Sequence, residues 1–202
     1  VPVEADGSAY FIAPAGVPIS FQALDEHGQA VQMMRSITYL QPGERLSCIG
    51  CHESRAQAAE LAPAPMALRR PPSRIVPGPD GSNPLNYAIL VQPVLDRHCV
   101  KCHCAPEPKG PAGKPIILTG EPEGAFTRSY NVLAPRTAFS AWGGLEENGE
   151  PMTAPDRFGA RASPLVRMLR EGHNGVILAA EEWERLITWI DANSLFYGTF
   201  DP

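Results

Sequence analysis

Two copies of one short cysteine–histidine pattern constrain this 202-residue chain more than any other feature. Residues 48–52 read Cys-Ile-Gly-Cys-His, and residues 99–103 read Cys-Val-Lys-Cys-His. In such a C-x-x-C-H pattern the two thiols can form thioethers with the vinyl groups of one porphyrin, and the histidine can bind its iron. Because the chain has only 5 cysteines and 5 histidines, two complete copies predict two covalently bound c-type haems.

This prediction gives a role to each cysteine and histidine of the two patterns. The cysteines attach the haems, and the histidine of each pattern is the proximal ligand of its iron. The attaching residues are Cys48, Cys51, Cys99 and Cys102, and the proximal ligands are His52 and His103.

Other uses of paired cysteines fit the patterns less well. A structural zinc site could use four cysteines, but zinc does not require a histidine after each second cysteine. A dithiol redox motif would open a helix in a βαβ unit, which neither copy does. Disulfides would leave the histidines unexplained. The fifth cysteine, Cys104, is expected to be a small buried or capped side chain beside the haem; a reactive thiol and an intermolecular bridge are the alternatives.

The remaining histidines bear on the sixth ligand of the second haem. Two strong axial ligands favour electron transfer, whereas a vacant position can bind a substrate. His173 lies between Gly172 and Gly175, and glycines let a backbone approach a flat cofactor closely. We therefore expect His173 to be this ligand, with an exposed loop histidine as the alternative. His98 directly precedes Cys99 and cannot easily reach the opposite face of that porphyrin, so we expect it at a helix end or in a hydrogen bond.

The sixth ligand of the first haem has four candidates. Met33 and Met34 fall on an expected strand of the same unit, where packing in the core is their alternative role. His27 falls at the tip of an expected turn. It could be merely exposed, or it could bind a haem in its own or in a neighbouring subunit. A vacant position is the fourth candidate.

Composition predicts a loop-rich globular protein. With 22 prolines and 18 glycines, about a fifth of the chain favours turns, so long helices must be few. The net charge of −5 argues against a nucleic-acid-binding protein. No apolar run approaches the roughly 20 residues that span a bilayer. Because the chain begins without methionine, we expect a processed product or a piece of a longer protein.

We expect an α+β fold of two units joined by a linker. Residues 1–61 should form a small β-sandwich-like unit with the first haem, because apolar residues alternate over 17–23 before a turn at 25–28. Residues 62–84 are rich in proline and predict a semi-rigid linker. Residues 85–202 should form a loop-rich, mainly α-helical, cytochrome c-like domain with the second haem.

Three helical segments and one short strand are expected in the second unit. Apolar residues recur at helical spacing over residues 87–95, and Pro93 should interrupt or kink this helix. Residues 164–171 predict a short helix, and residues 181–192 predict an amphipathic one with a single apolar stripe. The strand is expected at residues 116–118.

Eight segments of the chain also read like parts of one known protein family. They are residues 7–11, 14–19, 21–25, 34–36, 39–44, 48–53, 169–173 and 182–191. They resemble the hydrazine-synthase-alpha-subunit-related multidomain cytochromes, which are common in planctomycetes and similar bacteria. The resemblance covers most of the chain apart from the proline-rich segment and residues 105–160.

The resemblance implies a β-propeller-like region upstream, a middle domain with one c-type haem and a C-terminal cytochrome domain with a bis-histidine haem. The pattern at 99–103 and His173 match the last of these haems. In hydrazine synthase the first haem is catalytic, and a tyrosine four residues after the motif histidine binds its iron. This chain has Ala56 there, which argues against hydrazine chemistry. His52 is therefore expected to be the ordinary proximal ligand of the first haem. The family residue at position 27 is acidic, so His27 becomes a more specific ligand candidate.

The predicted function is electron transfer by a dihaem c-type cytochrome. Because covalent haem attachment follows export, the protein is expected in the periplasm or outside the cell, with redox proteins as partners. Subunits could also stack as a homo-oligomer or filament with a continuous chain of haems, with a ligand such as His27 donated across the interface. One alternative is a haem enzyme whose open first haem binds a small nitrogen or oxygen species, and another is a zinc-stabilised structural module. We favour an electron carrier over an enzyme.

Overall fold

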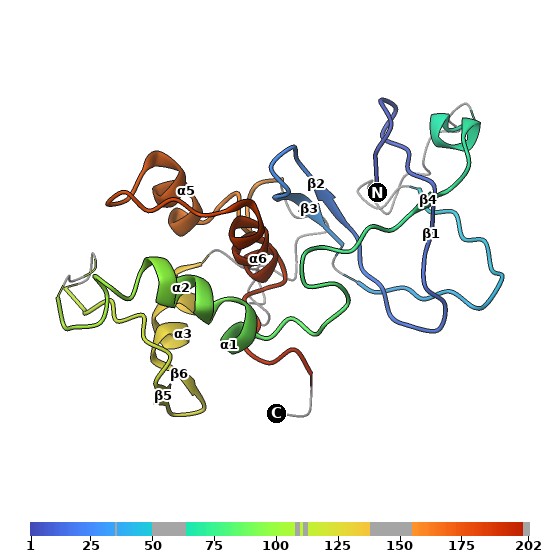
Figure 1. Ribbon diagram of the computed structural model, residues 1–202. Coiled ribbons are helices and arrows are strands. Elements are labelled where there is room, and N and C mark those ends of the chain that lie inside the picture. The colour runs from blue at the N-terminus through green and yellow to red at the C-terminus, as the bar shows by residue number, and fades with distance from the viewer. Residues whose placement is uncertain (35, 50–63, 108–109, 111–112, 138–154, 200–202) are drawn as a thin grey trace.

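The computed structural model describes residues 1–34, 36–49, 64–107, 110, 113–137 and 155–199. Short helices alternate with two-stranded sheets (Figure 1). The strands are β1 (Phe11–Ile12), β2 (Gln22–Leu24), β3 (Ala30–Met33), β4 (Ser73–Arg74), β5 (Pro122–Glu123) and β6 (Phe126–Thr127). The helices are α1 (Tyr87–Leu90), α2 (Gln92–His98), α3 (Arg128–Leu133), α5 (Pro164–Glu171) and α6 (Ala180–Asp191), with 3-10 turns η1 (Met66–Arg69) and η2 (Ala134–Arg136). Among the described residues, no helix is both long and apolar enough to cross a membrane.

The expected hairpin in the first unit is present as β2 and β3, which pair in antiparallel fashion. Its turn is held by the Asp25 carboxylate, which accepts the backbone N–H groups of His27 and Gln29, both at 2.9 Å. Gly28 has φ +72°, a conformation that glycine adopts without a steric penalty. A further bridge joins Ile19 to Thr38. The described strands form two-stranded pairs, each strand two to four residues long. The sandwich-like unit expected over residues 1–61 stays a prediction.

The proline-rich segment folds back against the start of the chain. Strand β4 pairs in parallel with β1. The backbone N–H of Met66 donates to the Asp6 carboxylate at 2.8 Å, and the Arg70 guanidinium donates to Glu4 at 2.6 Å. Residues 64–74 therefore contact the start of the chain through strand pairing and hydrogen bonds.

The main hydrophobic core lies among the helices of the second unit. Tyr87 and Trp189 are fully buried at its centre, with ring centroids 5.1 Å apart. The helical pattern before Cys99 divides into α1 and α2 because Pro93 lies in the first turn of α2, where its missing N–H is tolerated. Helix α5 has the predicted bounds, and α6 lies within one residue of them. Residues 116–118, expected as a strand, lie outside any strand.

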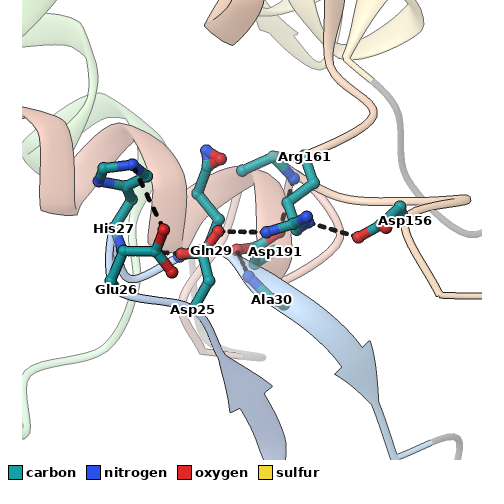
Figure 2. A network of polar contacts seen from close by, with 9 residues as sticks. Asp25, Glu26, His27, Gln29, Ala30, Asp156, Arg161 and Asp191 are labelled. Atoms are coloured by element: carbon teal, nitrogen blue, oxygen red, sulfur yellow. Dashed lines mark hydrogen bonds and ion pairs between the residues drawn. The ribbon is translucent and has the colours of Figure 1, made fainter.

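A buried carboxylate at the end of α6 joins the two units (Figure 2). The Asp191 side chain accepts the backbone N–H of Ala30 in β3 at 2.9 Å and that of Ala160 at 2.6 Å. The Asp191 carbonyl accepts the Gln22 amide at 2.7 Å. Burial raises the pKa of Asp191, and the two backbone donors oppose this rise by favouring the ionised form.

The Asp191→Asn substitution tests this junction. It replaces one acceptor oxygen with an NH2 group that faces a backbone donor, so a buried N–H would lose its partner. We expect the free energy of unfolding, measured by urea denaturation, to fall by about 1–3 kcal/mol. Glu26→Gln, at an exposed position on the same hairpin, is the control and should change stability little. Equal stability of Asp191→Asn and wild type would show that the junction does not depend on this carboxylate.

Candidate functional site

The second C-x-x-C-H pattern continues the helical winding at the end of α2. The Cys99 N–H donates to the Leu95 carbonyl at 2.8 Å, and the His103 N–H donates to the Cys99 carbonyl at 3.0 Å. Residues three and four positions apart lie on the same side of a helical turn. The Cys102 and His103 side chains therefore lie on the same side of the turn as Cys99, as attachment to one porphyrin requires.

A backbone carbonyl fixes the orientation of the His103 ring. The ring Nδ1 lies 3.0 Å from the carbonyl oxygen of Ile116. Because that oxygen can only accept, Nδ1 carries the proton and Nε2 keeps a lone pair for a metal. A second hydrogen bond, from the Leu118 N–H to the His103 carbonyl at 2.8 Å, holds the segment around Ile116 beside His103. Nothing in the sequence marks Ile116 for this role, because the contact uses its backbone.

His173, in the loop between α5 and α6, faces His103. The ring centroids are 6.1 Å apart, with 21° between the ring planes, and both side chains are half-buried. Metal–imidazole bonds are about 2 Å long, so one iron bound by both rings would hold their centres roughly 6 Å apart. The loop reaches this position through positive φ angles of 102° at Gly172 and 73° at Gly175. The two histidines that the sequence assigns to one haem are therefore brought together at the spacing of a shared metal.

The thiols of the second pattern differ in exposure. Cys99 packs against the hydrophobic core, and burial, with a smaller contribution from Cys102, raises its pKa to about 11. Cys102 and Cys104 are exposed, and none of the three forms a disulfide with another described residue. A capped position of Cys104 beside the haem stays a prediction. Within the described ranges, no group of three or more Cys, His, Asp or Glu residues is placed to hold a metal ion, as the zinc alternative would require.

His98 has the structural role that the sequence predicts. It is the last residue of α2, and its Nε2 lies 2.9 Å from the buried carboxylate of Glu182 in α6. Glu182 also accepts the guanidinium of Arg97 and, at 2.8 Å, the backbone N–H of Ala179. Burial acts to raise the pKa of Glu182, but these hydrogen bonds together hold it below its usual value. The cluster ties the end of α2, just before Cys99, to the start of α6.

The first pattern is only partly described. Cys48 is exposed, while Cys51, His52 and Ala56 lie outside the described residues. His27 is exposed on the hairpin turn, 3.9 Å from Glu26. After the hairpin the chain pairs Thr38 with Ile19, so it runs back from this turn before it reaches Cys48.

The other two ligand candidates for the first haem lie at the end of the hairpin. Met33 and Met34 are half-buried. The Met33 methyl lies close to Gly159. It is 3.7 Å from the position that a Cβ atom would occupy on that glycine. Met33 thus packs toward the second unit. Ligation of the first haem by His27, Met33 or Met34 stays a prediction.

Known proteins resemble this chain in two ways. The family model for the hydrazine synthase alpha subunit middle domain matches residues 1–53, a range that includes the first C-x-x-C-H pattern. Hydrazine synthase subunit alpha from Kuenenia stuttgartiensis is 26% identical over 182 residues. That alignment covers 65% of this chain but 22% of the relative, so this chain corresponds to a small part of that protein. No solved structure matches the chain significantly.

The Glu182→Gln substitution tests the cluster beside the second pattern. It removes the charge that His98 and Arg97 contact, and we expect the free energy of unfolding at neutral pH to fall by about 1–2 kcal/mol. Because the folded pKa of Glu182 is lowered, its contribution is present above the unfolded pKa of about 4.3 and is lost as pH falls through the folded pKa. Urea denaturation across this pH range should show the two proteins converging in acid. Glu181→Gln, at the exposed neighbouring position, should track wild type; a pH-independent difference would contradict this account.

Proposed function

Because the chain is related to the hydrazine synthase alpha subunit family, we propose that it is a c-type cytochrome that binds two haems covalently and transfers electrons. The observation that carries the proposal is the facing pair of His103 and His173 beside the thiols of the second pattern. Bound haem iron would supply reversible one-electron transfer.

The residues around this pair fit a haem with two axial histidines. Cys99 and Cys102 would attach the porphyrin, and His103 would bind the iron through the Nε2 that the Ile116 carbonyl leaves unprotonated. His173 would be the second histidine that holds this haem. A haem held by two histidines of the chain would supply electron transfer rather than a place for a substrate.

The first haem decides between the proposed function and its alternative. Its pattern at 48–52 falls inside the range that matches the family model, which supports haem attachment there. Its sixth ligand would be His27, Met33 or Met34 in an electron carrier. A vacant position would favour an enzyme that acts on a small nitrogen or oxygen species, a candidate supported by the similarity to a synthase subunit. Ala56 in place of the family's iron-binding tyrosine argues against hydrazine chemistry.

The cellular setting follows from the chemistry of attachment. Covalent c-type haems are attached after export, so we propose a periplasmic or extracellular protein with redox proteins as partners. Assembly of subunits into a homo-oligomer or filament remains part of this proposal, because His27 is exposed on a turn where it could reach a neighbouring subunit.

Optical spectra of the purified haem-loaded protein test the proposal. We expect two haems per chain, sharp reduced c-type bands after dithionite, and no change on adding carbon monoxide. In His173→Ala one axial position opens, so carbon monoxide should shift the bands of about half the haem. Ile177→Ala is the matched control, because Ile177 lies in the same loop and its side chain is 82% exposed.

The possible outcomes separate the functions. Carbon monoxide binding to about half the haem of the wild type, and to all of it in His173→Ala, would favour the enzyme alternative. An unchanged spectrum in His173→Ala would contradict the assignment of His173. Absence of a Soret band in the wild type would overturn the proposal of a cytochrome.

A further inference from the structure

A cavity of about 290 Å³ lies where the turn of the β2–β3 hairpin meets α5. It belongs to neither C-x-x-C-H pattern and includes none of the predicted haem ligands. Its lining residues are Gln29, Ala160, Arg161, Val166, Arg167, Arg170 and Glu171. The polar members of this lining are mostly hydrogen-bond donors.

Gln29 places an unpaired donor at this cavity. The residue is only 6% exposed, and its side-chain Nε2 is buried without a hydrogen-bond partner among the described residues. Its backbone N–H is already satisfied by Asp25 at 2.9 Å, and in Figure 2 no dashed contact reaches its side-chain amide. A buried N–H group without an acceptor is costly and rare in native proteins. None of the described residues supplies an acceptor for this amide, so an acceptor bound at the cavity would be favourable.

Arg161 brings a guanidinium whose position is fixed. Its donors contact the carboxylates of Asp25 and Asp156, as Figure 2 shows. A guanidinium carries five N–H donors in a planar fork, so these two contacts leave donors for a further acceptor. The paired carboxylates hold the group in place beside Gln29, and its side chain remains partly exposed.

Two further arginines come from α5. Neither Arg167 nor Arg170 forms an ion pair with another described residue, and the Arg170 guanidinium lies 5.5 Å from the centroid of the Trp183 ring. Glu171 is the one acidic residue in the lining, and Ala160 and Val166 are apolar. The cavity therefore presents the guanidinium groups of Arg167 and Arg170, a third guanidinium that is already paired with two carboxylates, and one unpaired amide donor, beside the carboxylate of Glu171.

We propose that this cavity binds a small oxyanion, a carboxylate or a phosphate. Guanidinium groups bind both through paired, charge-assisted hydrogen bonds, and the amide of Gln29 would donate a further bond. Two sources could supply this chemistry. One is a free anion in solution. The other is a propionate of the protein's own second haem, since Arg170 is only three residues before His173 along the chain; this second source rests on the proposed function, whereas the first does not.

Calorimetric titration of the purified, haem-loaded protein with inorganic phosphate, and separately with acetate, tests the proposal in a buffer of low anion content. If a free anion occupies the cavity, the wild type should bind phosphate, and Arg167→Gln and Gln29→Leu should each weaken binding about tenfold. Glu171→Gln should bind several-fold more tightly, because the one carboxylate in the lining is removed. Arg69→Gln is the matched control, because Arg69 is exposed and does not line the cavity.

A haem propionate in the cavity would give a different result. The wild type would then bind neither added anion, and Arg167→Gln would shift the reduction potential of one haem and its pH dependence, while Arg69→Gln would not. Two results overturn the proposal. One is anion binding that Arg167→Gln and Gln29→Leu leave unchanged. The other is no anion binding together with identical potentials in all variants. Neither result bears on whether the protein carries haem, which the optical spectra decide separately.

Discussion

The buried Asp191 carboxylate is the interaction on which the arrangement of the whole chain depends. Its two oxygens accept backbone N–H groups from Ala30, in the N-terminal hairpin, and from Ala160, in the segment before α5. A carboxylate buried this deeply is costly unless its oxygens are satisfied. The cost is offset only when both segments are docked, so one side chain requires that three distant parts of the sequence meet at one point.

Helix α6 connects the Asp191 junction to the candidate haem site. Asp191 lies at its end and binds the hairpin, while Glu182 lies in its first turn and binds His98 at the end of α2. Between them the apolar face of α6 packs in the core with Trp189 and Ile190 fully buried. The helix thus connects the hairpin, the cavity beside it and the turn that carries Cys99. The positions of His103 and His173 depend on this frame, because one follows α2 and the other lies in the loop between α5 and α6.

Local signals predicted the hairpin, the break at Pro93 and helix α5, because each is encoded in neighbouring residues. The assignment of His103 and His173, which lie far apart in the sequence, to one haem came from the chemistry of the motif and stays a prediction. Contacts over long sequence separations were not predictable in this way. The proline-rich segment reads as a linker, since its pairing with β1 depends on side chains such as Glu4 and Asp6 some 60 residues earlier. The roles of the Ile116 carbonyl and the unpaired Gln29 amide could not be predicted from the sequence. A backbone acceptor has no side-chain pattern, and whether a donor finds a partner depends on the folded structure. The exposure of Cys104 likewise depends on how the loop after His103 folds.

The parallel pairing of β1 with β4 has a consequence for the order in which the protein is completed. Because synthesis runs from the N-terminal to the C-terminal side, residues 1–34 are made before the residues that stabilise them. Strand β1 can pair with β4 only after Ser73 has been synthesised. The backbone N–H of Ala30 can donate to its acceptor only after Asp191 has been synthesised. Contacts this distant in sequence form slowly, because a long loop must close before they contribute any stability. The β2–β3 hairpin is therefore synthesised well before helix α6, whose Asp191 holds it, and β1 well before the strand with which it pairs.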